Sequence, residues 1–405
     1  LKNTLLDVGN TQNYQPFMIY DLSQRTVLDT LSAVKYATNS EDNPLDVPYG
    51  YTKIGTMEKT YTDGKTREIY VYQNDYALPL MYAYDSYIST DTYESLESNE
   101  KEQAMLQGII LSESNLPEQQ LKFNYRTILN KEAVERQIEQ AAESNENVEL
   151  QDGKIIVKKD GTTVKLTIPD NVTGELYVKI NGIEYTAKTD SYTRDEDQQL
   201  SVYEKHVQER NLRQKGEVES ASLAFTMGDN YTRNSLLSPS NQYYYGKRNM
   251  LANLGYCTTQ ETLYIRFSTA GEYSYEDIAV ISQPMTQYAA QVSKLQETPV
   301  TDLSVQGNCI TGNINTDSAK AVCTAVPYSE GWSAYVDGQE TEIKLANGMY
   351  MAVEVTPGNH QIMYVYHTPG IYAGIAISLL AIGILLLLIG IPTWWQTICR
   401  IRKQY

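Results

Sequence analysis

The chain has 405 residues, and its 50 acidic and 33 basic side chains give a net charge of −17. This charge argues against nucleic acid or an anionic membrane surface as the main partner. Tyrosine occurs 34 times but phenylalanine only four times, which favours β-structure whose aromatic rings also form hydrogen bonds. We expect a mainly β chain with some α that does not bind nucleic acid.

Residues 1–120 are predicted to form a small α+β domain. Apolar side chains recur at helical spacing from Val27 to Val34, within "QRTVLDTLSAVKYATN". The segments "REIYVYQND" and "ALPLMYAYDSYIS" have the composition and alternation of strands. A turn at Asn74-Asp75 separates them, so an α+β layer is the simplest outcome.

A connector and a β-sandwich follow. The capped, mostly polar segment "NKEAVERQIEQAAESNENVE" predicts a helix and makes residues 121–152 a helical connector. Beyond it, short alternating segments are separated by the hairpin dipeptides Asp-Gly at 160–161 and Asn-Gly at 181–182. Many short strands with turns at these intervals predict a jelly-roll-like β-sandwich over residues 153–298, with a tyrosine-rich and acidic insert.

The tyrosine-rich part of this insert is a candidate ligand site. In "NQYYYGKRN", the rings of Tyr243, Tyr244 and Tyr245 are joined by the cations Lys247 and Arg248. Aromatic faces stack on sugar rings, and the guanidinium fork of arginine fits phosphate, so these residues could line a sugar- or phosphate-binding rim. An ordinary tyrosine-rich loop or strand edge has the same composition and is the alternative interpretation.

Residues 299–368 are predicted to form a small antiparallel β meander next to the membrane. Turn dipeptides at 337–338, 347–348 and 357–358 divide it into strands, beginning with the hairpin "GWSAYVDGQETEI". Alternate residues of the strand "NGMYMAVEV" are apolar, so one of its faces is available to pack on another layer.

The sequence allows more than one role for several aromatic and cysteine side chains of this meander. Trp332, Tyr335 and Tyr350 are candidates for ligand contacts, although a lone tryptophan in a small meander usually fills its core. Cys309 and Cys323 lie on successive predicted strands. A single disulfide and two buried thiols are equally compatible with the sequence, because hairpin register is not readable from it.

An apolar run near the C-terminus predicts one transmembrane helix. Residues 371–391, "IYAGIAISLLAIGILLLLIGI", contain no charge, and at ~1.5 Å rise per residue they span the ~30 Å hydrocarbon core. Trp394 and Trp395 follow as interfacial aromatics, and the basic tail 392–405 is placed in the cytoplasm by the positive-inside rule. Residues 1–370 are then extracytoplasmic, and the lipid bilayer is a partner. A buried core helix, or one helix of a bundle, is the alternative.

Motifs for metal binding or catalysis are missing from the sequence. His206, His360 and His367 are the only histidines, and none lies at metal-ligand spacing. The sequence has no HExxH, GxSxG, P-loop or CxxC pattern. We expect no metal site and assign no catalytic residue, although 50 acidic side chains leave a glycosidase-type carboxylate pair open.

Several segments resemble one family. "PYSEGWSAYVDG", "NGMYMAVEVTPGNHQIMYVYHTPG" and the terminal apolar helix resemble the C-terminal end of the YfhO family of bacterial multi-pass membrane proteins. In that family a "GW.AYVDG" hairpin and a "PG.H.I...Y.PPG" strand precede the last transmembrane helix. The upstream "VKYATN", "PYGY" and "YQNDYALPLMY" also resemble family segments, with Leu80 where a basic residue is common. The resemblance is good over 320–391, fair over 25–90 and poor over 120–215.

This resemblance implies a C-type glycosyltransferase-like protein. Such enzymes take a sugar from a polyprenyl-phosphate donor and place it on an extracytoplasmic acceptor such as lipoteichoic acid. The family's catalytic acid belongs to an early external loop that has no counterpart in this sequence, so no catalytic residue is carried over and no cofactor is expected in this part. Its expected role is acceptor handling or docking, with its own upstream transmembrane bundle and a cell-envelope glycopolymer as partners.

A non-catalytic cell-surface protein is the alternative function. It would be an adhesin or a carbohydrate-binding sandwich held by one C-terminal membrane anchor. Leu1 in place of Met leads us to expect further sequence upstream. A series of membrane spans there would favour the glycosyltransferase, and a signal peptide would favour the surface protein.

Overall fold

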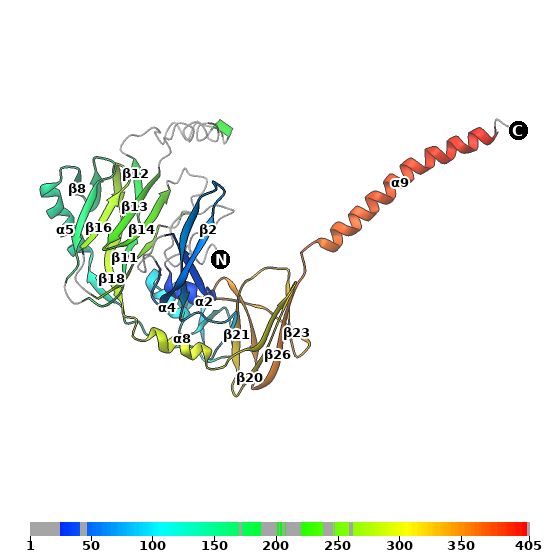
Figure 1. The fold of residues 1–405 in the computed structure, drawn as a ribbon, viewed down its shortest axis with the longest axis horizontal. Coiled ribbons are helices and arrows are strands. Elements are labelled where there is room, and N and C mark those ends of the chain that lie inside the picture. The colour runs from blue at the N-terminus through cyan, green and yellow to red at the C-terminus, as the bar shows by residue number, and fades with distance from the viewer. Residues whose placement is uncertain are drawn as a thin grey trace.

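The computed structural model describes residues 25–40, 47–169, 172–187, 201, 203–204, 207, 220–237, 246, 248–258 and 262–402. In these residues the fold is mainly β, and a long helix extends from its C-terminal end (Figure 1). The helices are α2 (Thr26–Leu31), α3 (Thr90–Glu94), α4 (Ser98–Met105), α5 (Lys131–Ser144), α8 (Tyr288–Gln296) and α9 (Ile371–Arg402). The predicted fold class, mainly β with some α and one C-terminal apolar helix, is confirmed.

The middle of the chain is a β-sandwich with a large apolar core. Its strands form sheets in the orders β10-β16-β13-β14, β15-β11-β18-β7 and β12-β17-β9-β8. They are β7 (Arg126–Leu129), β8 (Val148–Gln151), β9 (Lys154–Val157), β10 (Thr163–Thr167), β11 (Gly174–Asn181), β12 (Glu184–Ala187), β13 (Ser220–Met227), β14 (Asn230–Leu237), β15 (Met250–Cys257), β16 (Thr262–Phe267), β17 (Gly271–Ser274) and β18 (Asp277–Gln283).

The alternating sequence explains how these strands face the core. In β10, Val164 and Leu166 are buried while their neighbours in the strand are exposed, because successive side chains point to opposite faces. Helix α5 is capped by Asn130, as the sequence predicts, and buries Val134 and Ile138 against the same core. The connector helix is therefore part of the sandwich.

The two hairpins predicted at 160–161 and 181–182 are wrong. Strand β9 pairs with β8 and β17, whereas β10 pairs with β16. Likewise β11 pairs with β15 and β18, whereas β12 pairs with β17. Gly161 and Gly182 do adopt positive φ angles of 75° and 66°, so the turns themselves form. Turn residues set the local backbone, but each strand takes the partner that buries its apolar face in the common core.

The N-terminal layer contains one antiparallel sheet and a short parallel pair. The sheet has the order β1-β3-β2, and β5 runs parallel to β6. These strands are β1 (Tyr36–Asn39), β2 (Tyr51–Thr60), β3 (Thr66–Asn74), β5 (Tyr87–Ser89) and β6 (Ile109–Leu111). The helix predicted up to Val34 ends earlier, at Leu31, because Ala33 takes a left-handed φ of 57° that a right-handed helix does not continue through.

The C-terminal strands form two sheets that share an apolar core. Their orders are β19-β20-β26-β22-β23 and β24-β25-β21-β4. The strands are β4 (Met81–Tyr84), β19 (Thr301–Gln306), β20 (Cys309–Thr316), β21 (Lys320–Pro327), β22 (Trp332–Val336), β23 (Gln339–Thr341), β24 (Lys344–Ala346), β25 (Tyr350–Val355) and β26 (Gly358–Tyr366). We call this part the C-terminal sandwich.

The predicted turns of the C-terminal sandwich have different outcomes. The hairpins at 337–338 and 347–348 are confirmed, since β22 pairs with β23 and β24 pairs with β25. The strands on either side of 357–358 do not pair, because β25 lies between β24 and β21 while β26 lies between β20 and β22. Met351 and Val353 of β25 are buried in the core that β26 also lines. Burial of this apolar face against a second sheet replaces the single meander that the sequence predicts.

Strand β4 ties the N-terminal layer to the C-terminal sandwich. It pairs antiparallel with β21, where Tyr82 lies opposite Cys323. An apolar core combines residues between 27 and 116 with residues between 285 and 352. The division into four extracytoplasmic segments stays a prediction, but a sheet and a core join the first segment to the last.

The cysteines of the C-terminal sandwich lie in different sheets. Cys309 is on β20 and Cys323 on β21, and both are free thiols. Cys323 is completely buried, which raises the pKa of its thiol to about 12. Because both cysteines are free, the disulfide between Cys309 and Cys323 that the sequence left open is not formed.

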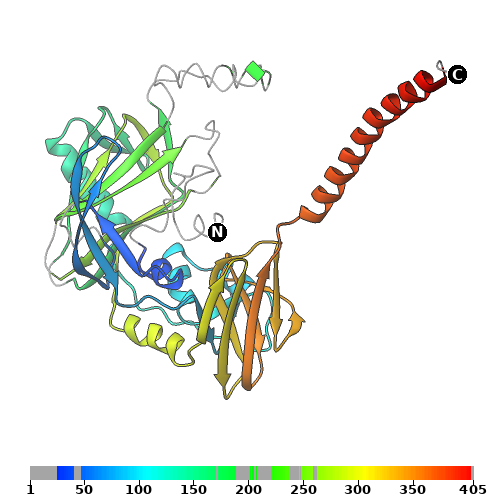
Figure 2. The ribbon, with the colours of Figure 1, turned by 45° about the vertical axis from the view of Figure 1, so that its right-hand side comes forward.

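Helix α9 extends away from the rest of the molecule, as the views in Figure 1 and Figure 2 both show. The segment 371–389 of this helix is long and apolar enough to cross a membrane. None of this segment is buried by the described residues. A core helix would be covered by other elements, so the exposure of this span among the described residues favours a membrane-spanning helix over a core helix.

Candidate functional site

The predicted sugar- or phosphate-binding rim lies mostly outside the described residues. Tyr243, Tyr244, Tyr245 and Lys247 belong to the part of the chain that the structure does not describe. Arg248 is described, at the end of the β-sandwich just before β15. The binding role of this group stays a prediction.

Arg248 is engaged by two carboxylates. Its Nη1 lies 2.8 Å from Oε1 of Glu184, and its Nη2 lies 3.0 Å from Oε1 of Glu276. These contacts orient the guanidinium and offset its charge, which lowers its attraction for a phosphate group. The ion pairs fix the start of β15 to the strand ends at the same edge of the sandwich.

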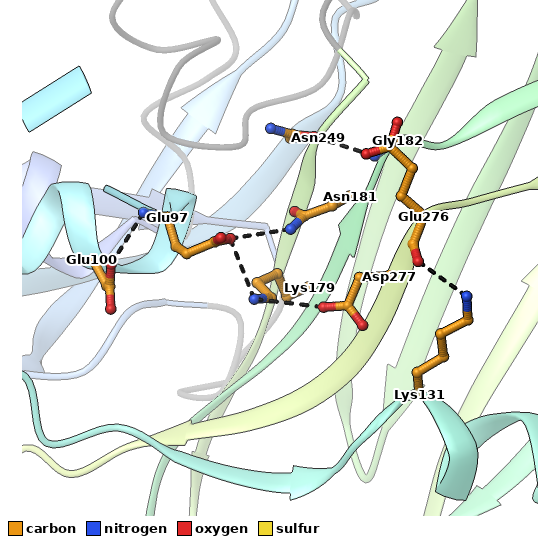
Figure 3. Close-up of polar contacts among 9 residues, drawn as sticks. All are labelled: Glu97, Glu100, Lys131, Lys179, Asn181, Gly182, Asn249, Glu276 and Asp277. Carbon is orange, nitrogen blue, oxygen red and sulfur yellow. Dashed lines mark hydrogen bonds and ion pairs between the residues drawn. The ribbon is translucent and has the colours of Figure 1, made fainter. Parts of the chain in front are cut away.

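Figure 3 shows a connected group of polar contacts at this edge. Glu97 precedes α4, and its Oε2 accepts hydrogen bonds from Nδ2 of Asn181 at 3.1 Å and Nζ of Lys179 at 3.4 Å. Lys179 also lies 3.7 Å from Asp277, at the start of β18. The side chain of Glu100 in turn accepts a hydrogen bond from the backbone amide of Glu97, completing the capping box of α4. Helix α4 is thus attached to β11 by its N-terminus.

The same strand continues this interface inward. Leu176 and Val178 of β11 enter the sandwich core, so the alternate residues Glu175, Tyr177 and Lys179 point to the opposite face. There they contact side chains of the N-terminal layer. We call the interface of α2 and α4 with this face of β11 the seam.

Charged groups are buried inside the seam. Arg25 and Glu102 form an ion pair in which each side chain is only 4% exposed. Glu175 is 1% exposed, and its carboxylate accepts hydrogen bonds from the hydroxyls of Thr26 and Tyr177 and from Nδ2 of Asn253. Buried charges need such partners, because desolvation of an unpaired charge costs several kcal/mol. The seam is therefore a polar joint that is specified in detail.

Asp29 of α2 is the most perturbed acid of this region. Burial raises the pKa of its carboxyl to about 7, and the negative charge of Glu175 acts in the same direction. The hydrogen bond that Tyr51 donates to Asp29 Oδ2 at 2.9 Å, and the positive charge of Arg25, oppose this rise in pKa without cancelling it. Burial therefore favours the neutral form of the Asp29 carboxyl.

The acidic side chains of the seam are buried and do not form an open reaction centre. Asp29 and Glu175 are 6% and 1% exposed, so a substrate does not reach them in this conformation. Among the described residues there is also no group of three or more histidine, cysteine, aspartate or glutamate side chains that could hold a metal ion.

The membrane end of the molecule contains the other predicted site residues. Trp332 is half-buried, and its ring lies 5.2 Å from that of Tyr366 and 6.5 Å from that of Tyr364. This favours the packing role of Trp332, while Tyr335 is half-buried on the same strand. Tyr350 is 2% exposed and hydrogen-bonds to Ser32, so the expected surface contact is wrong for this residue.

Sequence reasoning missed the seam. Arg25 and Glu102 are 77 residues apart, and Thr26 and Glu175 are 149 residues apart, so no local spacing reveals them. One usable signal was "GELYVKIN", in which Glu175, Tyr177 and Lys179 alternate with the apolar residues that face the core, so the opposite face of this strand is polar.

Comparison with known proteins gives the family. The model of the family described as "Bacterial membrane protein YfhO" matches residues 2–378. The chain belongs to the YfhO family. It is 20% identical over 370 residues to the uncharacterized protein YfhO of Bacillus subtilis (strain 168), covering 89% of this chain and 36% of that protein. The chain thus spans about a third of the length of this relative.

Solved structures similar to this YfhO-family chain are remote. Latent PorU of Porphyromonas gingivalis is 12% identical, with a TM-score of 0.18 and coverage of 54% of this chain and 18% of PorU. A cycloisomaltooligosaccharide glucanotransferase of Paenibacillus sp. is 8% identical, with a TM-score of 0.18 and coverage of 68% and 49%. At these TM-scores neither likeness carries an argument about fold or function.

The structure gives the YfhO-like motif at the membrane end a physical role. Asp337, in the turn of the "AYVDG" hairpin, has a φ of 53° and accepts a hydrogen bond from the amide of Gln361 at 2.8 Å. His360 of "PGNH" lies 2.7 Å from Asp337, and its other ring nitrogen lies 2.9 Å from the carbonyl oxygen of Thr356. The two halves of the motif therefore hold the hairpin β22–β23 against β26, the strand that leads into α9.

Proposed function

We propose that this chain is the extracytoplasmic C-terminal region of a YfhO-type membrane glycosyltransferase. The parent enzyme transfers a sugar from a polyprenyl-phosphate donor to a cell-envelope polymer such as lipoteichoic acid. This region handles the acceptor and docks onto the membrane-embedded part, with its C-terminal tail in the cytoplasm. The catalytic acid belongs to the rest of the parent protein, and this chain requires no cofactor of its own.

The observation that carries the proposal is the rigid passage from β26 into the membrane helix. Only residues 367–370 separate β26 from α9. The amide of Tyr366 donates to the carbonyl oxygen of Asn308 at 2.8 Å, and that of His367 donates to the carbonyl oxygen of Gly331 at 2.7 Å. A Cβ at Gly331 would lie 2.5 Å from the carbonyl oxygen of His367, so the chains approach as closely as glycine permits.

A short fixed link has a functional consequence. It keeps the C-terminal sandwich at the bilayer surface, where a polyprenyl-phosphate donor is confined. An acceptor polymer held there has a high effective concentration near a membrane-embedded active site, which speeds transfer without new contacts to the reacting atoms.

Deletion of the parent gene in its own bacterium tests the proposal. The measurement is the number of sugar substituents per phosphate on the isolated envelope polymer, by NMR. We expect the substituents to disappear in the deletion strain and to return with the full-length protein. A membrane-inserted protein that lacks the extracytoplasmic β-structure should not restore them. Unchanged sugar content in the deletion strain would overturn the proposal and favour the non-catalytic surface protein.

A further inference from the structure

Four tyrosine rings converge beside the seam, from segments far apart in the sequence. The ring centroid of Tyr49 lies 4.9 Å from that of Tyr256, 6.0 Å from that of Tyr76 and 6.1 Å from that of Tyr288. The rings of Tyr76 and Tyr288 lie 5.0 Å apart. We call these four residues the tyrosine platform.

The tyrosine platform is held rigidly from beneath. The hydroxyl of Tyr288 forms a 2.6 Å hydrogen bond with that of Thr30, and Tyr288 itself is 2% exposed. Gly50, with a φ of 90°, lies so close to the ring of Tyr76 that an added Cβ would be 2.4 Å from a ring carbon. Rings fixed in this way lose little conformational entropy when a ligand binds, so binding energy is not spent on ordering them.

Three of the four rings reach the surface. Tyr256 is 37% exposed, and Tyr49 and Tyr76 are half-buried. Asp75 is exposed directly beside Tyr76, and its Oδ2 accepts a hydrogen bond from Thr52 at 2.7 Å. Exposed tyrosine rings combine an apolar surface with hydroxyl groups that form hydrogen bonds.

We propose that the tyrosine platform binds a gluco-configured pyranose ring of a saccharide. Such a ring has its substituents equatorial, which leaves two flat C–H faces to stack on aromatic rings and a rim of hydroxyls to hydrogen-bond. The inference rests on the proposed function and names the place at which a sugar is held.

A cationic ligand fits the surroundings less well. Aromatic clusters bind ammonium groups best when accessible negative charge lies close by. The buried acids nearest to the tyrosine platform are Glu175, which accepts the amide of Tyr49 at 3.4 Å, and Asp29. Both are almost fully buried and engaged by hydrogen bonds. The exposed carboxylate of Asp75, next to Tyr76, is engaged by the hydroxyl of Thr52, so one partly satisfied acid is the only anionic group that the described residues around these rings offer to a cation. Neutral saccharide is the ligand class to which the chemistry points.

Binding to the purified 405-residue chain in detergent tests the proposal. The probes are cellopentaose and maltoheptaose, which are gluco-configured, with mannopentaose and tetramethylammonium chloride as comparisons. Isothermal titration should show millimolar or tighter binding of at least one glucan. Mannopentaose, whose 2-hydroxyl is axial, should bind more weakly. Failure of both glucans to bind, or binding of tetramethylammonium alone, would overturn the assignment.

Variants locate the site. We expect Tyr49→Ala and Tyr256→Ala each to weaken glucan binding by about tenfold, whereas Tyr256→Phe keeps the ring and most of the affinity. Tyr264→Ala, at a tyrosine of β16 that is 43% exposed, is the matched control and should bind as the parent does. Equal binding by Tyr49→Ala, Tyr256→Ala and Tyr264→Ala would place the sugar elsewhere.

The two proposals fail separately. Glucan titration needs no donor and no membrane, so its failure leaves the transfer activity of the parent protein intact. Unchanged polymer glycosylation in the deletion strain would instead overturn the proposed enzyme activity. The proposal that the tyrosine platform binds a saccharide would stand.

Discussion

Two buried acids of the seam differ in how their charges are supported. Glu175 accepts hydrogen bonds from two hydroxyls, from the side-chain amide of Asn253 and from the backbone amide of Tyr49, whereas the pKa of Asp29 is raised to about 7 by burial. A charged group without full support makes stability depend on pH, because folded and unfolded states bind different numbers of protons. The difference between these residues therefore has a measurable consequence.

Asp29→Asn should flatten the fall in stability between about pH 4 and pH 7. The folded pKa of about 7 lies above the usual value of 3.8, so the folded state binds the proton more tightly and loses stability as pH rises through this window. The full difference corresponds to roughly 4 kcal/mol above pH 7. Urea unfolding of both proteins at a series of pH values measures it. A parent and a variant with parallel stability profiles would show that Asp29 titrates normally.

Glu102→Ala should destabilise the protein by about 3–5 kcal/mol, because it removes a buried carboxylate that pairs with the buried guanidinium of Arg25. Glu272→Ala is the matched control: its pair with Lys154 is exposed on both sides, and its loss should cost less than about 1 kcal/mol. The free energy of unfolding in urea compares them. Similar values for the two variants would mean that the buried pair does not support the seam.

At the scale of elements, the sequence predicts local features better than it predicts which strands pair. The cap of α5, the turns of β22–β23 and β24–β25, and the apolar run of α9 all depend on residues close together, and these predictions are confirmed. The strand partners after 160–161, 181–182 and 357–358 were missed. Which strands pair is decided by burial of whole faces in common cores, and this is a non-local property that turn dipeptides do not encode.

The same reasoning applies to the candidate sites. Tyrosine enrichment favoured β-structure with hydrogen-bonding rings, and as a ligand site the sequence pointed to the run of three tyrosines at 243–245. The tyrosine platform combines Tyr49, Tyr76, Tyr256 and Tyr288, which no window of sequence contains together. Composition therefore predicts the kind of side chain at a site, while the fold decides which copies meet.

Strand β4 provides an element-scale prediction. Both β4 and β2 lie at the end of their sheets, but all four residues of β4 are buried where it pairs with β21, whereas nearly all of β2 is exposed. Hydrogen exchange should therefore be slow at the β4 amides that pair with β21 and fast along the edge of β2. Mass spectrometry of peptides covering 81–84 and 51–60 measures this. Equally fast exchange in both would contradict the shared sheet.

Three junctions connect the parts of the molecule to one another and to the membrane helix. The seam joins the β-sandwich to the N-terminal layer, β4 joins that layer to the C-terminal sandwich, and residues 367–370 lead into α9 (Figure 2). Each junction is short or buried. A ligand bound to one part would therefore keep a defined position relative to α9, which is what the proposed acceptor handling requires.

Labelling in intact cells tests the orientation that this arrangement needs. Thr62 lies in the exposed turn between β2 and β3, so a membrane-impermeant maleimide should modify Thr62→Cys in the full-length protein from outside. The native Cys399, beyond the membrane span, is the internal control and should react only after the membrane is opened. Modification of Thr62→Cys only in opened cells would place the β-structure in the cytoplasm.

Reconstituted transfer tests the central claim most directly. The full-length parent protein is placed in liposomes with a radiolabelled polyprenyl-phosphate sugar and purified lipoteichoic acid, and label in the polymer is counted. The account predicts transfer by the full-length protein, reduced transfer by its Tyr49→Ala and Tyr256→Ala variants, and none by residues 1–405 alone. Transfer by residues 1–405 alone would show that catalysis lies within this chain. Absence of transfer by the correctly folded full-length protein would contradict the glycosyltransferase assignment.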